Sequence, residues 1–449
     1  MSIVDQLVLY RNKDSLLERL MNLCEKAAAQ DAAVMKPEAS EGPAQPAKED
    51  QDMAGEYSGC ISELVDLSER FGFSGNLWHC YLTYLLVYGE NVYSRACEIR
   101  GAVPGGMNAL AEADFTIFMK LFREDFHAVE KRTGAGWYAM INGYENEGGN
   151  RKVFNRRIRD RICELAVKLA AAEDVRSFKA LMEEFYREFG VGKFGLHKAF
   201  RVRHTQERGV EIVPITNIAH VYLEDLVGYD IPKQKLIENT EAFVRGRKAN
   251  NCLLFGDAGT GKSSCIKGIL NRYYGEGLRI IEIYKHQFKD LNDVIAQIKN
   301  RNYKFIIYMD DLSFEEFETD YKYLKAVIEG GLEKKPDNIL IYATSNRRHL
   351  IRENYSDKEE TREDMHTSDT VQEKLSLVYR FGVTIYFGSP NKKEFQNIVR
   401  VLAQRNGVNV PEDELMLEAN KWELGHGGLS GRTAQQFIDH LLGKEAEEA

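Results

Sequence analysis

The stretch CLLFGDAGTGKSSCIKGIL, residues 252–270, decides the fold of this chain. Its first four residues are apolar, as in a buried strand, and the residues from Lys262 onward repeat apolar side chains at helical spacing. Between them, GDAGTGKS at residues 256–263 fits the pattern GxxxxGK[ST] in the strand–loop–helix context that this pattern requires. A glycine-rich turn that matches by chance is the alternative, and the flanking strand and helix favour a phosphate-binding loop (P-loop).

The chemistry of this loop indicates ATP with Mg²⁺. Glycines let backbone N–H groups turn toward phosphate oxygens, and the following helix directs its positive end at the same anion. We expect Lys262 to contact the β- and γ-phosphates and Ser263 to offer a hydroxyl ligand to Mg²⁺. The predicted nucleotide-binding residues of the loop are Gly256, Asp257, Ala258, Gly259, Thr260, Gly261, Lys262, Ser263 and Ser264.

A second apolar strand, residues 304–309, ends in the acidic pair Asp310 and Asp311. Asp310 is predicted to hold Mg²⁺ together with Ser263, and Asp311 to polarise the attacking water. An ordinary acidic turn after a strand is the alternative. Many ATPases carry Glu at the second position, so Asp311 is compatible with slow turnover. Glu315 and Glu316 are fallback candidates for the base.

A third strand, residues 338–343, is followed by small polar residues. Asn346, or Thr344 before it, is expected to hydrogen-bond the attacking water or the γ-phosphate, although a polar turn explains this segment alone equally well. Short apolar runs that alternate with helical stretches predict a mostly parallel α/β sheet. The predicted strands are residues 252–255, 279–284, 305–309, 339–343 and 383–387.

Composition limits the partners and the compartment. The 449 residues carry a net charge of -9, which argues mildly against a protein that coats duplex nucleic acid but leaves a local basic patch open. We find no run long and apolar enough for a membrane span and no secretory signal pattern, so the sequence predicts a cytoplasmic protein. The seven cysteines include no CxxC pair and are interpreted as reduced thiols.

The order of these motifs resembles the AAA+ ATPases over residues 218–442. More narrowly, the chain resembles an uncharacterised bacterial group within them, the DUF815 family. The segments that carry this resemblance are LVGYDIPKQKLIENTEAF, LLFGDAGTGKSS, MDDLSFE, LKAVIEGGLEKKPDNILIYATSNRRHLI, EKLSLVYRFG and GLSGRTAQQFIDHL.

The resemblance implies roles for further residues. Arg380 matches the arginine finger, which reaches the γ-phosphate of a neighbouring subunit, and Arg347 and Arg348 are rival candidates. Arg432 matches the lid arginine that contacts the γ-phosphate in its own subunit. Gly228 and Tyr229 resemble the segment that packs on adenine. The implied catalytic set is Asp311, Asn346, Arg380 and Arg432.

These patterns predict three regions. They are a mostly helical N-terminal domain over residues 1–210 with a flexible loop at 29–55, an AAA+ α/β core with a five-stranded parallel sheet over 211–388, and a helical lid over 389–449.

The implied activity is Mg²⁺-dependent ATP hydrolysis to ADP and phosphate. It would remodel an unidentified protein or nucleic-acid partner, with an ATP-dependent homo-oligomer as one expected assembly. Two alternatives stay open: a slow-hydrolysing, ATP-gated switch or scaffold, and a DNA-associated ATPase similar to helicase loaders. A P-loop kinase is disfavoured by Asn346, Arg380 and Arg432.

Overall fold

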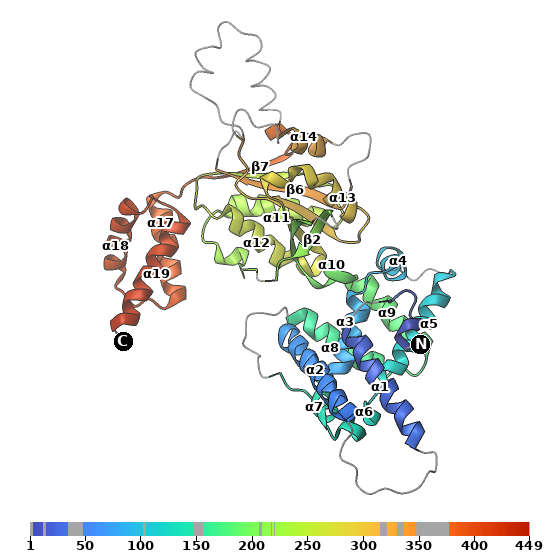
Figure 1. Ribbon diagram of the computed structural model, residues 1–449. Coiled ribbons are helices and arrows are strands. Elements are labelled where there is room, and N and C mark those ends of the chain that lie inside the picture. The colour runs from blue at the N-terminus through green and yellow to red at the C-terminus, as the bar shows by residue number, and fades with distance from the viewer. Residues whose placement is uncertain are drawn as a thin grey trace. The chain divides into compact units, whose positions relative to one another are not determined.

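The chain forms two compact units, Met1–Leu196 and His197–Ala449, which are described separately (Figure 1). The computed structural model describes residues 3–11, 15–34, 48–101, 105–146, 156–205, 209–216, 218–219, 221–314, 321–329, 336–346, 350 and 377–448. Within these ranges, no helix has both the length and the apolar character needed to cross a membrane.

The first unit is helical throughout its described part. Its core is rich in aromatic side chains, among them Trp78, whose indole N–H donates to the Leu121 carbonyl oxygen at 2.7 Å. The elements are η1 (Ile3–Gln6), α1 (Ser15–Val34), α2 (Lys48–Phe71), α3 (Leu77–Tyr88), α4 (Val92–Arg100), α5 (Met107–Phe122), α6 (His127–Thr133), α7 (Trp137–Asn142), α8 (Arg156–Ala170), α9 (Val175–Phe189) and α10 (Gly192–Leu196).

The flexible loop predicted at residues 29–55 is wrong at both of its ends. Residues 29–34 continue α1 and residues 48–55 belong to α2, whereas the stretch between them lies outside the described residues. The first end is rich in alanine, which has the highest helix propensity. At the second end Met53 is buried in the core. The helix propensity of alanine and the burial of Met53 therefore outweigh the polar composition that predicts a loop.

The second unit is built on a mixed sheet of seven strands in its described part, not the five predicted. The order across the sheet is β2-β1-β4-β5-β6-β3-β7. All neighbouring pairs from β1 to β7 are parallel, and β2 is antiparallel to β1. The strands are β1 (Ala199–Thr205), β2 (Gly209–Pro214), β3 (Cys252–Gly256), β4 (Leu278–Glu282), β5 (Lys304–Met309), β6 (Ile339–Ser345) and β7 (Val383–Phe387).

The last five of these strands are the predicted parallel set, and β1 and β2 are the additions. In β1 the buried Phe200 and Val202 alternate with the exposed Arg201 and Arg203. Such alternation is typical of a strand with one solvated face, unlike the continuous apolar runs of the inner strands. Because this pair joins the sheet, the compact units divide after Leu196, earlier than the predicted boundary at residue 210.

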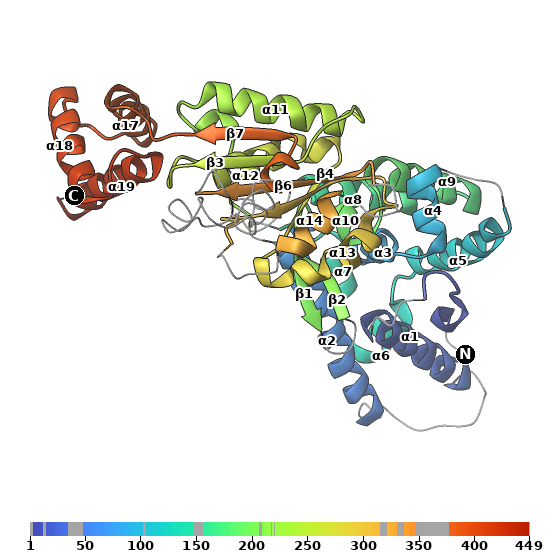
Figure 2. The same cartoon turned by 90° about the horizontal axis from the view of Figure 1, so that it is seen from above.

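Helices cover both faces of the sheet, as Figure 2 shows from above. On one face α11 (Asp230–Val244) and α12 (Lys262–Tyr273) share a buried cluster with strand residues such as Tyr342 and Phe387. On the other face lie α13 (Leu291–Ile298) and α14 (Tyr321–Glu329). Short 3₁₀ turns η2 (Leu223–Asp225), η3 (Tyr274–Glu276) and η4 (Lys285–Asp290) connect these elements.

Three helices after β7 form a small body with its own buried cluster. They are α17 (Lys392–Asn406), α18 (Glu412–Gly425) and α19 (Gly431–Glu448), drawn in red in Figure 1. Phe395 and Phe437 are the aromatic members of this buried cluster, and Val227 from the segment before α11 packs against it. We refer to this body as the lid.

Candidate functional site

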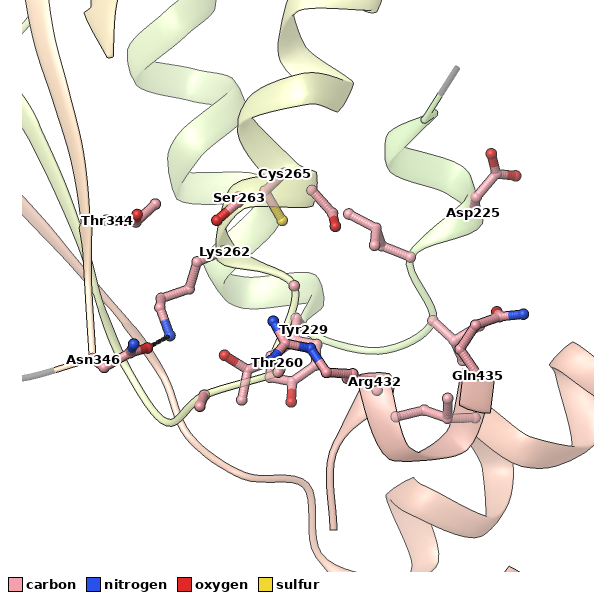
Figure 3. A pocket seen from close by; sticks show the side chains of 18 of the residues that line it. Asp225, Tyr229, Thr260, Lys262, Ser263, Cys265, Thr344, Asn346, Arg432 and Gln435 are labelled. Carbon is pink, nitrogen blue, oxygen red and sulfur yellow. Dashed lines mark hydrogen bonds between the residues drawn. The ribbon is translucent and has the colours of Figure 1, made fainter. Parts of the chain in front are cut away.

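A cavity of about 660 Å³ lies at the carboxyl ends of the parallel strands, between the α/β core and the lid (Figure 3). A cavity of this size is in the range that holds small-molecule ligands. It is lined by Asp225, Leu226, Val227, Tyr229, Ala258, Gly259, Thr260, Gly261, Lys262, Ser263, Ser264, Cys265, Asp310, Asp311, Thr344, Asn346, Ile398, Leu402, Gly431, Arg432 and Gln435.

The P-loop glycines have backbone conformations that side chains disfavour. The φ angles of Gly256, Gly259 and Gly261 are 134°, 74° and 88°. At Gly256 a Cβ atom would lie 2.1 Å from the Phe387 carbonyl oxygen, so this glycine permits close contact with β7. Gly256 and Asp257 therefore face β7 and do not line the cavity, whereas the other seven predicted loop residues line it.

Lys262 points back at its own loop and across to β6. Its ammonium group donates to the carbonyl oxygens of Gly256 and Asp257, at 3.0 and 2.6 Å, and to Asn346 Oδ1 at 3.0 Å, the dashed line in Figure 3. Burial lowers the pKa of Lys262, and the nearby carboxylates act against that shift. The ammonium group is thus held next to the loop with acceptors that a phosphate oxygen can replace.

The Asp310 carboxylate accepts three hydrogen bonds on one oxygen. Its Oδ1 receives the hydroxyl groups of Thr344 and Tyr308, both at 2.6 Å, and that of Ser263 at 2.8 Å. Burial acts to raise the pKa of Asp310, but these three hydrogen bonds outweigh it and lower the pKa. A hydroxyl and an ionised carboxylate in contact form the hard oxygen donor set that suits Mg²⁺, so the residues fit this ion.

Asp311 is turned toward Asn346 by an uncommon backbone angle. Its φ of 49° lies in the left-handed region, which Asp tolerates better than most residues. Its N–H donates to Thr344 Oγ1 at 3.0 Å, and the Asn346 amide donates to Asp311 Oδ1 at 2.8 Å. Lys262, Asn346 and Asp311 therefore form one chain of hydrogen bonds across the floor of the cavity.

The lid contributes one wall of the cavity through two of its helices. Arg432 and Gln435 come from the same lid helix, α19 (Figure 3). The Arg432 N–H donates to the Gly259 carbonyl oxygen at 3.2 Å, so the lid contacts the P-loop through the backbone. Ile398 and Leu402, four residues apart on α17, add an apolar surface.

Arg380 is far from this cavity within its own chain. It lies just before β7, which pairs with β3 from Val383 opposite Cys252 to Phe387 opposite Gly256. Five residues of strand span about 17 Å, and the P-loop begins at the far end of that pairing. Arg380 therefore lies at the amino ends of the parallel strands, whereas the cavity lies at their carboxyl ends.

The remaining predicted residues fall in different places. Tyr229 lines the cavity at a φ of 58°, its ring 5.5 Å from that of Phe387, and its buried hydroxyl has no hydrogen-bond partner among the described residues. Burial, with smaller contributions from nearby carboxylates, raises its pKa to about 12. Gly228 is exposed and does not line the cavity. The rival and fallback candidates Arg347, Arg348, Glu315 and Glu316 lie outside the described residues.

Sequence reasoning missed Tyr308, and of the lid residues that line the cavity it predicted only Arg432. Tyr308 is two residues before Asp310 on β5, and period-two alternation places both side chains on one face. Gln435 is three residues after Arg432, which is the spacing of one helix face. Both signals are present in the sequence. The apolar pair on α17 has no such signal, because its place depends on how the lid packs against the core.

Comparison with known proteins places this geometry in a family. The model of a family described as "Protein of unknown function (DUF815)" matches residues 195–445, more than half of the chain. The chain belongs to the DUF815 family. The matched residues include the GxxxxGK[ST] pattern at residues 256–263 and the other motifs by which the chain resembles the AAA+ proteins.

Other proteins show more distant similarity to this DUF815 chain. The chromosomal replication initiator protein DnaA of Borreliella burgdorferi is 26% identical over 204 residues, which are 42% of this chain and 38% of the relative. The chain thus spans well under half the length of that relative. A variant of RuvB from Thermotoga maritima is 17% identical, with a TM-score of 0.35 over 49% of this chain and 63% of the other. Thermotoga maritima RuvB described as a Holliday junction branch migration motor is 13% identical, with a TM-score of 0.31 over 49% and 71%.

Proposed function

We propose that this DUF815 protein is a Mg²⁺-dependent ATPase that couples hydrolysis to movement of its lid and of a partner. One observation carries the proposal. Lys262, Ser263, Asp310 and Asn346 come from three separate segments, yet they join in hydrogen-bonded contact inside one cavity that the lid residue Arg432 also lines.

Each side chain has a task that follows from its position. Ser263 and Asp310 would hold Mg²⁺, which when bound neutralises charge on the phosphate oxygens. Lys262 would exchange the P-loop carbonyl oxygens for phosphate oxygens. Asp311 would accept the proton of the attacking water, with Asn346 fixing the orientation of its carboxylate. Arg432 would reach the γ-phosphate from the lid.

The direct test is a phosphate-release assay on the full-length chain with ATP and Mg²⁺. We expect steady turnover that Lys262→Ala and Asp310→Ala abolish. Lys267→Ala is the matched control, because Lys267 is an exposed lysine on the same helix, α12, and does not line the cavity. Turnover that persists in both site variants would reject the proposed site.

A slow-hydrolysing, ATP-gated switch or scaffold is the second candidate. The residue that supports this candidate is Asp311. Its side chain is shorter than that of the usual Glu, and its carboxylate already accepts a hydrogen bond from the Asn346 amide at 2.8 Å. ATP binding without measurable phosphate release, with or without DNA, would favour the switch over the enzyme. Release of a phosphorylated product in place of free phosphate would instead revive the kinase reading.

The place of Arg380 supports action on a neighbouring copy. At the amino ends of the parallel strands it is out of reach of its own cavity, as an arginine finger acting between subunits would be. Size-exclusion chromatography with and without ATP tests this assembly. A monomer under both conditions would count against Arg380 acting between subunits.

The partner is proposed to be a protein or a nucleic acid. The similarity to a replication initiator protein keeps a DNA-associated ATPase, similar to helicase loaders, among the candidates. An Asp311→Asn variant should bind ATP and hydrolyse it slowly, so a pull-down in ATP should retain the partner of the ATP state. Single- and double-stranded DNA added to the phosphate-release assay tests the nucleic-acid alternative by stimulation of turnover.

A further inference from the structure

Two cysteines of the first unit lie in contact with each other, and neither of them lines the nucleotide cavity. Cys80 is on α3 and Cys163 is on α8, and their sulfur atoms are 3.9 Å apart although 83 positions separate them in the sequence. A disulfide bond is about 2.05 Å long, so the two sulfur atoms would need to approach by roughly 1.9 Å.

The pair is within reach of small solutes. Cys163 is partly exposed and Cys80 is buried behind it. The Cys80 thiol also lies 3.7 Å from the carbonyl oxygen of Ser74, an exposed residue. Because Cys163 is the less buried of the two residues, we expect a small oxidant to meet it first, with the Cys80 sulfur 3.9 Å from the Cys163 sulfur.

The surroundings make the two thiols chemically unequal. The Cys80 S–H donates toward the Cys163 sulfur, and Arg159, one turn earlier on α8, adds positive charge. The hydrogen bond from Cys80 is the main cause that lowers the pKa of Cys163, against the opposing effect of burial. Burial raises the pKa of Cys97, elsewhere in this unit, to about 11. Of the two thiols, Cys163 is thus the one that loses its proton more readily.

We propose that Cys80 and Cys163 are a redox-active dithiol that closes to a disulfide between α3 and α8 on reaction with a peroxide. The Cys163 thiolate attacks one oxygen of hydrogen peroxide, which breaks the O–O bond and leaves a sulfenic acid and hydroxide. The Cys80 sulfur then attacks the sulfenic sulfur, the S–OH bond breaks, and the proton of Cys80 leaves with the hydroxyl group as water. In sum, two thiols and one peroxide give one disulfide and two waters.

Closure has a measurable consequence for the first unit. The new bond would close a long loop, because the two cysteines are 83 positions apart. Cross-links that close long loops restrict the unfolded chain most, so the oxidised unit should melt at a higher temperature than the reduced unit. A reductant such as dithiothreitol should reverse the change.

The test uses full-length protein that has been reduced and freed of reductant. It is treated with a small molar excess of hydrogen peroxide, the remaining thiols are blocked with iodoacetamide, and the non-reduced digest is analysed by mass spectrometry. We expect a linked pair of peptides that contains Cys80 and Cys163 and disappears with dithiothreitol. Alkylation of both cysteines after peroxide treatment, or pairing of either with another cysteine, would overturn the proposal.

Single-cysteine variants separate the role of the attacking thiol, Cys163, from that of the resolving thiol, Cys80. In Cys80→Ser, dimedone should trap a sulfenic acid on Cys163, because the resolving thiol is gone. In Cys163→Ser, Cys80 should stay alkylatable, and oxidation of Cys80 at the wild-type rate would contradict the assigned order. Cys97→Ser is the matched control, since Cys97 is a buried cysteine of the same unit and its loss should leave the linked peptides unchanged. The wild-type digest alone decides the main claim.

Discussion

Gly259→Ala should weaken ATP binding by forcing the lid away from the P-loop. Gly259 has a φ of 74°, and an added Cβ would lie 2.9 Å from Ser430 Oγ and 3.1 Å from Arg432 Cβ. Ser430 has little freedom to move, because it is buried and its hydroxyl accepts the Thr433 N–H at 3.1 Å. The start of α19 must therefore shift when the methyl group is added.

The magnitude has two parts that a control can separate. A side chain in the left-handed region costs roughly 1–2 kcal/mol, and overpacking adds about 1–3 kcal/mol. Gly277→Ala is the control, because Gly277 has a φ of 95° and open space around its Cβ position. In both variants the backbone cost should lower the free energy of unfolding. Only Gly259→Ala should also show the overpacking cost, which corresponds to about 5–150-fold in nucleotide affinity.

The assay is equilibrium ATP binding by titration calorimetry, together with urea unfolding of both variants. Ser430→Ala in the Gly259→Ala background removes the nearest colliding atom and should restore part of the affinity. If Gly259→Ala binds ATP as well as Gly277→Ala does, the contact between the P-loop and the lid does not control nucleotide binding and the reasoning is refuted.

Three further predictions concern other contacts. Thr344→Val removes a hydroxyl that donates to Asp310, and at about 1.5–3 kcal/mol for such a bond phosphate release should fall roughly 10–150-fold; an unchanged rate would contradict this role. Asp257→Ala should speed hydrogen exchange of the Ser389 N–H, which donates to Asp257 Oδ2 at 2.7 Å, whereas Asp257→Asn keeps an acceptor and should keep the protection. Burial lowers the pKa of His79, so just below the ordinary pKa of histidine the unfolded chain binds more protons than the folded chain. The free energy of unfolding, measured by urea titration, should therefore drop from pH 7 to pH 5. The drop should be smaller in His79→Gln.

The parallel core could be predicted because its signals are local. The strand ending at Gly256, the loop to Lys262 and the helix after it are all fixed by neighbouring residues, and β7 matches its predicted bounds, Val383–Phe387. The inner strands β3, β4, β5 and β6 are buried on both faces, as such apolar runs predict, whereas the edge strand β7 leaves Thr384 and Tyr386 exposed. Sequence pattern is therefore sufficient for the fold of this part.

What could not be predicted depends on contacts between distant segments. The alternation of Phe200 and Val202 with charged residues is a local strand signal that the prediction overlooked, whereas the pairing of β1 with β4 joins distant segments and no local motif states it. The sequence predicts Thr344 only as a contact of water or phosphate. In the structure its hydroxyl donates to the Asp310 carboxylate and accepts the Asp311 N–H. The lid wall at Ile398 depends on how α17 packs against the core.

The most direct test of the central claim is ATP binding to the full-length chain with and without Mg²⁺. We predict saturable binding of one ATP per chain, strengthened by Mg²⁺, weakened strongly by Lys262→Ala and unchanged by Lys267→Ala. Asp310→Ala should remove the dependence on Mg²⁺, because Asp310 and Ser263 are the proposed ligands. Binding that is absent in the wild type, or that is equal in wild type and Lys262→Ala, would contradict the assignment of this cavity as the nucleotide site.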